Sequence, residues 1–248
     1  MTVNQSNRKT ALGPLSQRLV RTPYTYLFLN ILAIFFLFPL GERIRDTIPI
    51  IQILFFSMLL FVLRVLQVSR RVLLFFALMS SLSLASDLFF FPALFQSVSH
   101  SEIMKARILV PLIDGILVLS VIIIFLQRIF REQVVSADTI LGGITVYFLF
   151  GILWTVFYRI LLLLEPAAIS VTDPLFPANQ LLYFSFITLM TVGYGDIVPL
   201  TPIARNLAVL EAFTGQLYLA IFISRLVGLH LTTAKEKNDV PGGGSAKS

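Results

Sequence analysis

Six apolar segments, each of 19 or more residues, dominate the sequence and restrict what it can fold into. A helix needs about 20 apolar residues to cross the roughly 30 Å hydrocarbon core of a bilayer. The composition agrees, because only 13% of the residues are charged, whereas about a quarter are charged in soluble domains. The sequence therefore predicts an all-α membrane protein with six transmembrane helices, at residues 22–40, 47–68, 72–95, 108–126, 140–164 and 202–229.

A seventh apolar stretch, residues 178–190, is too short to cross a bilayer. Irregular backbone at membrane depth is tolerated only where protein or a water-filled cavity surrounds it. We therefore expect a re-entrant half-helix here, followed by a loop at membrane depth and then the last spanning helix.

The positions of lysine and arginine predict the topology. Twelve of these residues fall in the N-terminal segment, the second and fourth connections and the tail, against four in the opposite connections. The positive-inside rule then places both termini in the cytoplasm of a multi-pass protein of the plasma or inner membrane. Because the charge lies beside apolar runs, we expect the net charge of +6 to reflect membrane topology and not binding to nucleic acid.

The loop after the half-helix reads TVGYGD, from Thr191 to Asp196. Glycine adopts positive φ at little cost. Gly193 and Gly195 alternate with Val192 and Tyr194, so successive carbonyl groups can point the same way. Four such loops around an axis would form rings of carbonyl oxygens that replace the water shell of K⁺. The C-terminal end of the half-helix would add its partial negative charge.

This loop and its flanking helices resemble the pore domain of potassium channels, in which TVGYG is the known filter sequence. The similarity covers residues 140–229, and the whole chain resembles the six-helix channel superfamily that contains the voltage-gated channels. The inner helix is most similar to those of prokaryotic potassium channels. The resemblance implies a homotetramer in membrane lipid, with K⁺ as the permeant ion and no other cofactor. It implies ion binding at Thr191, Val192, Gly193 and Tyr194, and a gating hinge at Gly215, for which close helix packing is the alternative.

Other residues are expected to support the filter. Asp196 would shape the electrostatics of the outer mouth, and Tyr183 and Phe184 would pack against Tyr194 as an aromatic cuff. Two positions depart from the family pattern. Met190 replaces a threonine that is common before the filter, and Ile187 stands where some bacterial relatives carry a bracing glutamate.

The four leading helices are similar to a voltage sensor in number but lack its charge array. Steep voltage gating needs three or four gating charges per subunit. The predicted fourth helix carries no positive residue between Arg107 and Arg128, and Arg131 follows beyond its end. We interpret these three arginines as interfacial anchors, with movement through the membrane field as the alternative. We therefore expect weak or absent voltage gating.

Three acids in predicted helices are further candidates for a role in gating. Asp87 and Asp114 fall at similar depth in the outer third of the membrane. They either share a proton as a pH-sensitive latch or bond locally to serine, backbone or nearby cations. Glu211 lies one turn before Gly215. It either influences gating from behind the filter or is a hydrogen-bonded acid packed against the half-helix or facing the cavity.

The predicted organisation has four parts. A cytoplasmic segment (1–21) precedes a voltage-sensor-like domain (22–131), a pore domain (132–230) and a flexible cytoplasmic tail (231–248). The terminal segments are too short for a soluble regulatory domain. The prediction is a passive K⁺ channel and not an enzyme, because no catalytic constellation or phosphate loop appears. The alternatives are a non-conducting regulatory subunit, a voltage-gated channel with an unusual sensor, and a potassium transporter.

Overall fold

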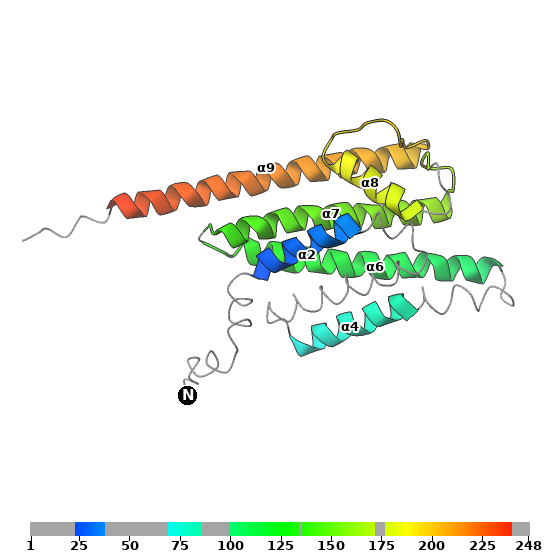
Figure 1. The fold of residues 1–248 in the computed structure, drawn as a ribbon, viewed down its shortest axis with the longest axis horizontal. Helices are drawn as coiled ribbons and strands as arrows, with labels where there is room; N and C mark the ends of the chain where they lie inside the picture. Colours follow the sequence, from blue (N-terminus) through cyan, green and yellow to red (C-terminus); the bar gives the residue numbers. More distant parts are fainter. Residues whose placement is uncertain (1–22, 38–68, 86–99, 134, 172–176, 240–248) are drawn as a thin grey trace, which may run out of the picture.

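The computed structural model describes residues 23–37, 69–85, 100–133, 135–171 and 177–239. Regular structure in these ranges is α-helical (Figure 1), apart from one isolated β-bridge between Ile169 and Pro199. The prediction of an all-helical protein is therefore confirmed for this part of the chain. The helices are α2 (Pro23–Leu37), α4 (Arg70–Ala85), α6 (His100–Ile129), α7 (Ala137–Leu164), α8 (Pro177–Leu189) and α9 (Pro202–Asp239).

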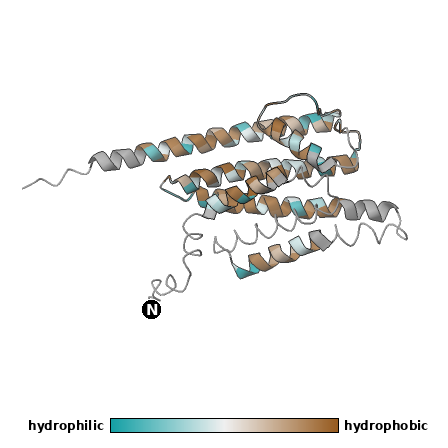
Figure 2. Ribbon diagram, in the orientation of Figure 1, coloured by the Kyte–Doolittle hydropathy of each residue, from teal (hydrophilic) through white to brown (hydrophobic). Residues whose placement is uncertain are grey.

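Within the described ranges, three helices are long and apolar enough to cross a membrane. They are Ile108–Ile129 of α6, Ala137–Leu164 (α7) and Pro202–Leu231 of α9. Figure 2 shows hydrophobic residues along each of these helices. Shorter apolar stretches lie in α2 and α8. The predicted span at 47–68 lies outside the described residues. Residues 22 and 38–40 of the span at 22–40, and residues 86–95 of the span at 72–95, lie outside them too. The arrangement of six spanning helices therefore stays a prediction.

Helix α7 lies at the centre of the bundle and contacts α2, α6, α8 and α9 (Figure 1). Small residues on α7 allow this close packing. A Cβ atom built on Gly143 would lie 1.9 Å from the ring of Phe222 in α9, and one on Gly151 would lie 2.8 Å from the ring of Phe186 in α8. The glycines of α7 therefore set how near the flanking helices can approach.

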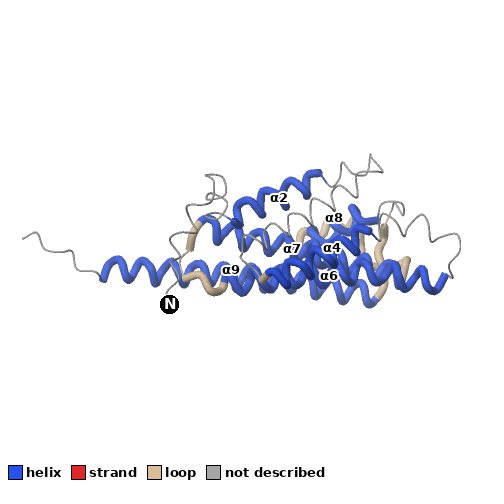
Figure 3. The backbone as a smooth tube through the Cα atoms, turned by 90° about the horizontal axis from the view of Figure 1, so that it is seen from below, coloured by secondary structure: helices blue, strands red, loops and turns tan. Residues whose placement is uncertain are grey.

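Two helices extend beyond their predicted bounds by eight or more residues. Helix α6 begins at His100 and not at residue 108. Helix α9 continues to Asp239, so the first part of the segment 231–248, which we expected to be flexible, is helical. Alanine, lysine and glutamate in residues 234–237 are good helix formers. The end of α9 projects past the other helices in two perpendicular views (Figures 1 and 3).

Arg225 of α9 binds the C-terminal end of α6 and the segment that connects α6 to α7. One terminal nitrogen of its guanidinium donates to the carbonyl oxygens of Ile129, at 2.9 Å, and Glu132, at 2.7 Å. The guanidinium carbon lies 4.8 Å from the centre of the Phe130 ring. The carboxylate of Glu132 accepts a hydrogen bond from Tyr24 of α2. Because the last carbonyls of a helix lack partners within it, Arg225 satisfies the end of α6 and ties it to α9.

Candidate functional site

The loop between α8 and α9, residues 190–201, has an alternating backbone conformation. Thr191, Gly193 and Gly195 have positive φ angles of 57°, 54° and 82°, whereas Val192 and Tyr194 do not. An alternation of this kind allows successive carbonyl groups to point toward the same side of the chain. The positive φ at Thr191 was not anticipated. It is rare for a β-branched residue, and such strained positions cluster at functional sites.

The amides at the start of the loop bond back to the end of α8. Val192 N and Gly193 N both donate to the carbonyl oxygen of Ile187, at 2.8 and 3.2 Å, and Thr191 N donates to that of Thr188 at 2.9 Å. These bonds satisfy carbonyls that a helix end leaves without partners. The loop is thus anchored through its N–H groups.

The loop is exposed along residues 190–196. The side chain of Tyr194 is 73% exposed and that of Val192 is 49% exposed, and a Cβ atom on Gly193 or Gly195 would meet nothing within 4 Å. One copy of the chain therefore leaves this surface uncovered.

The C-terminal part of the loop, residues 198–200, is hydrogen-bonded to the segment after α7. Ser170 N donates to the Val198 carbonyl at 3.0 Å, and Val198 N donates to Ser170 Oγ at 2.7 Å. Leu200 N donates to the carbonyl of Ala168 at 2.8 Å. Both ends of the loop are therefore held by backbone hydrogen bonds.

Tyr183 of α8 reaches the acid at the end of the TVGYGD motif. Its hydroxyl donates to Asp196 Oδ2 at 2.8 Å, and this hydrogen bond lowers the pKa of Asp196 below its usual range. Phe184 instead packs against Tyr158 of α7, with ring centres 4.9 Å apart, and is buried. The structure therefore does not assemble the expected cuff on Tyr194 within one chain, because these adjacent residues of α8 point in different directions.

Behind the loop, α7 and α9 contact the last carbonyl of α8. Tyr147 donates to the carbonyl oxygen of Leu189 at 3.0 Å. A Cβ atom on Gly215 would lie 2.4 Å from that same oxygen. Gln216 Nε2 donates to Thr191 Oγ1 at 3.4 Å. Sequence reasoning missed Tyr147 and Gln216, although each is a polar side chain inside an apolar segment.

Glu211 is fully buried where α7, α8 and α9 meet. Its two carboxyl oxygens lie 2.5 Å from the hydroxyl oxygens of Tyr158 and Ser185. Ser185 also donates to the carbonyl oxygen of Gly151 at 2.8 Å. This geometry corresponds to an acid packed against the half-helix. An influence of Glu211 on gating stays a prediction.

Among the remaining gating candidates, those that the structure describes lie in α6 or directly after it and not at the loop. Asp114 is half-buried in α6, and Arg128 and Arg131 are exposed at the C-terminal end of α6. The backbone of Arg107 lies in α6, but its side chain and all of Asp87 lie outside the described residues. The predicted latch between Asp87 and Asp114 therefore stays a prediction.

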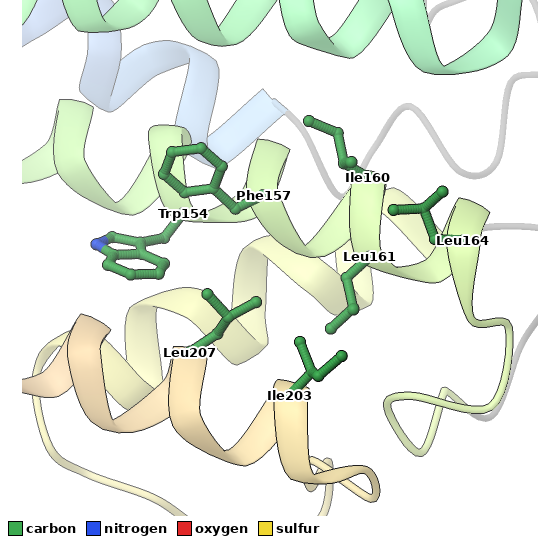
Figure 4. A pocket seen from close by; sticks show the side chains of 7 residues that line it. All are labelled: Trp154, Phe157, Ile160, Leu161, Leu164, Ile203 and Leu207. Carbon is green, nitrogen blue, oxygen red and sulfur yellow. The ribbon is translucent and has the colours of Figure 1, made fainter. Parts of the chain in front are cut away.

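An apolar hollow lies between α7 and the first turns of α9 (Figure 4). It offers only hydrocarbon and aromatic surface, so it suits lipid or protein side chains and not a hydrated ion. Its lining residues are Trp154, Phe157, Ile160, Leu161 and Leu164 of α7 with Ile203 and Leu207 of α9.

Comparisons with known proteins point to the same region. Residues 145–229 match a protein-family model described as "Ion channel". Two-pore potassium channel c of Oryza sativa subsp. japonica is 38% identical over 58 residues, which are 23% of this chain and 13% of that protein. Two-pore potassium channel 4 of Arabidopsis thaliana is 41% identical over 54 residues, 22% of this chain and 19% of that protein. Two-pore potassium channel 5 of the same plant is 43% identical over 51 residues, 21% of this chain and 12% of that protein.

These matches cover less than a fifth of the relatives' own length, and no solved structure matches the chain. The matched family is one of ion channels and not of enzymes. The matched residues 145–229 contain most of α7, all of α8, the loop and most of α9, so two of the three helices long enough to cross a membrane fall largely within them.

Proposed function

We propose that this chain is one subunit of a homotetrameric channel that conducts K⁺ passively across the plasma or inner membrane. The carbonyl oxygens of Thr191, Val192, Gly193 and Tyr194, with the Thr191 hydroxyl, coordinate the ion. The observation that carries the proposal is the alternation of positive φ at residues 191, 193 and 195. Backbone carbonyl rings of this kind replace the hydration shell of K⁺ in selectivity filters.

The requirement for several copies follows from geometry. One loop offers oxygens to an ion from one side only, and the face around Tyr194 is uncovered in the single chain. Most soluble oligomers consist of identical chains related by closed rotational symmetry. A fourfold arrangement surrounds the ion with equivalent loops and covers this exposed face.

An apolar stripe on α9 supports assembly through this helix. Val209, Phe213, Leu217 and Ile221 recur every four residues, and their side chains are 45–67% exposed. Residues four apart lie on one face of a helix. Such a stripe suits packing against neighbouring subunits or the wall of an inner cavity.

Gating by voltage is proposed to be weak or absent, since the stretch of α6 between Arg107 and Arg128 carries no positive residue. Both termini are proposed to be cytoplasmic. A non-conducting regulatory subunit and a voltage-gated channel with an unusual sensor are the competing functions. Open probability measured against voltage in planar bilayers distinguishes the voltage-gated channel from the proposed function, because a steep curve requires charge that moves through the membrane field.

The central experiment is K⁺ flux into liposomes that contain the purified protein, with Na⁺ as the competing ion. Gly193→Val places a branched side chain at φ +54°, where glycine alone is comfortable, so we expect K⁺ flux to fall to the background of empty liposomes. Gly228→Ala is the matched control, because a Cβ atom there meets nothing within 4 Å. K⁺ flux in Gly193→Val equal to that of the wild type refutes the assignment of this loop as the filter. A tetrameric wild-type protein without K⁺ flux favours the regulatory subunit.

A further inference from the structure

The hydroxyl group of Ser185 has two short contacts but only one proton to donate. Its oxygen lies 2.8 Å from the carbonyl oxygen of Gly151 and 2.5 Å from Glu211 Oε1. A backbone carbonyl can only accept a hydrogen bond. If the Ser185 proton points to Gly151, the bond between Ser185 and Glu211 needs a proton from the carboxyl group.

The second oxygen of Glu211 fits the same assignment. Tyr158 donates to Glu211 Oε2 at 2.5 Å, so this oxygen acts as an acceptor. A neutral carboxylic acid has one donor and one acceptor oxygen. The chain of bonds then runs from Tyr158 to Glu211, from Glu211 to Ser185 and from Ser185 to the Gly151 carbonyl, which also accepts from Thr155 Oγ1 at 2.8 Å.

Burial favours the neutral acid over the carboxylate. Glu211 has no exposed surface, and its two hydrogen-bond partners are uncharged hydroxyl groups. A buried charge without a compensating charge is costly, whereas a neutral polar group with all of its hydrogen bonds is tolerated.

This chain of hydrogen bonds links three helices close to the point where the loop is anchored. It joins α7 through Tyr158 and Gly151, α8 through Ser185 and α9 through Glu211. Ser185 lies two residues before Ile187, whose carbonyl holds the amides of Val192 and Gly193. A shift of α8 against α7 and α9 would therefore move the anchor of the loop.

We infer that Glu211 is a neutral carboxylic acid whose proton bonds to Ser185, and that it is a positioning residue that fixes α8 and the loop that α8 carries. The protonation of Glu211 stands on the hydrogen-bond geometry and on burial, and it does not depend on the function proposed above. Its effect on ion selectivity rests on the function proposed above.

Infrared spectroscopy of the protein, purified in a detergent without ester or carboxyl groups, tests the protonation directly. A protonated carboxylic acid has a C=O stretching band separate from those of carboxylates and of the backbone. We expect this band in the wild-type protein at neutral pH, its loss in Glu211→Gln and its retention in Glu165→Gln, the control at the C-terminal end of α7. A wild-type spectrum without a band that Glu211→Gln removes overturns the inference, whether or not the protein conducts K⁺.

Two substitutions of Glu211 test its positioning role. A glutamine amide donates to Ser185 and its carbonyl accepts from Tyr158, so Glu211→Gln should retain K⁺ flux and the preference for K⁺ over Na⁺. Glu211→Ala leaves both hydroxyl groups without this partner and should lose that preference. Equal loss in both variants overturns the positioning role. Absence of flux from the wild type refutes the proposed function instead, and the infrared band still decides the state of Glu211.

Discussion

The substitution Gly215→Ala tests how closely α9 packs against the end of α8. The new Cβ atom would lie 2.4 Å from the carbonyl oxygen of Leu189 and 3.0 Å from its Cδ1 atom. That oxygen is also the acceptor for Tyr147. The obstructing atom therefore belongs to the backbone and is held by a second helix, so it cannot turn aside as a flexible side chain would.

The expected loss of stability follows from how far the new Cβ atom overlaps the carbonyl oxygen of Leu189. Ordinary contacts of a Cβ atom begin near 3.4 Å, so α9 and the end of α8 must separate by about 1 Å, and overpacking of this kind costs about 1–3 kcal/mol. Alanine also returns at most about 1 kcal/mol of helix propensity. Gly228→Ala in the same helix carries this gain without the clash, because a Cβ atom there meets nothing within 4 Å.

The assay compares apparent melting temperatures of the wild type and both variants, purified in the same detergent. The difference between Gly215→Ala and Gly228→Ala isolates the clash, and we expect Gly215→Ala to melt lower by roughly 2–12 °C for a chain of this size. Equal melting temperatures would refute the packing argument. A gating hinge at Gly215 would then be the better interpretation, and a changed open probability in Gly215→Ala would support it.

Two further predictions concern Arg225 and Tyr183. Arg225→Ala removes the donor to the carbonyls of Ile129 and Glu132. Hydrogen bonds from charged groups contribute about 1.5–3 kcal/mol, so we expect a lower melting temperature and altered open probability in bilayers. Tyr183→Phe removes the hydrogen bond that lowers the pKa of Asp196. The contribution of ionised Asp196 to K⁺ flux is present at neutral pH and is lost as external pH falls through its lowered pKa. In the variant, the acid-side loss of K⁺ flux should therefore move to higher pH, and an unchanged midpoint would contradict the coupling.

The helices and the filter motif were predictable because their determinants are local. The half-helix was expected at 178–190 and α8 spans Pro177–Leu189. Hydrogen bonds within a helix join residues four apart, so the length of an apolar run is enough to indicate a helix. The alternation of glycine in TVGYGD similarly indicates the positive φ angles of Gly193 and Gly195 from the residues themselves.

The partners of the acids and arginines depend on contacts that no local pattern encodes. Glu211 contacts Ser185 and Tyr158, which lie 26 and 53 residues away in sequence. Arg225 meets the end of α6 across 96 residues. Glu211 was recognised as a candidate from the cost of an acid in an apolar helix, but its partners were not. The positions of the described helices and of the TVGYGD motif could be predicted from the amino-acid sequence, because those features depend on neighbouring residues. The hydroxyl groups and carbonyls that meet each buried polar group became known from the folded structure, because helix packing sets those distances.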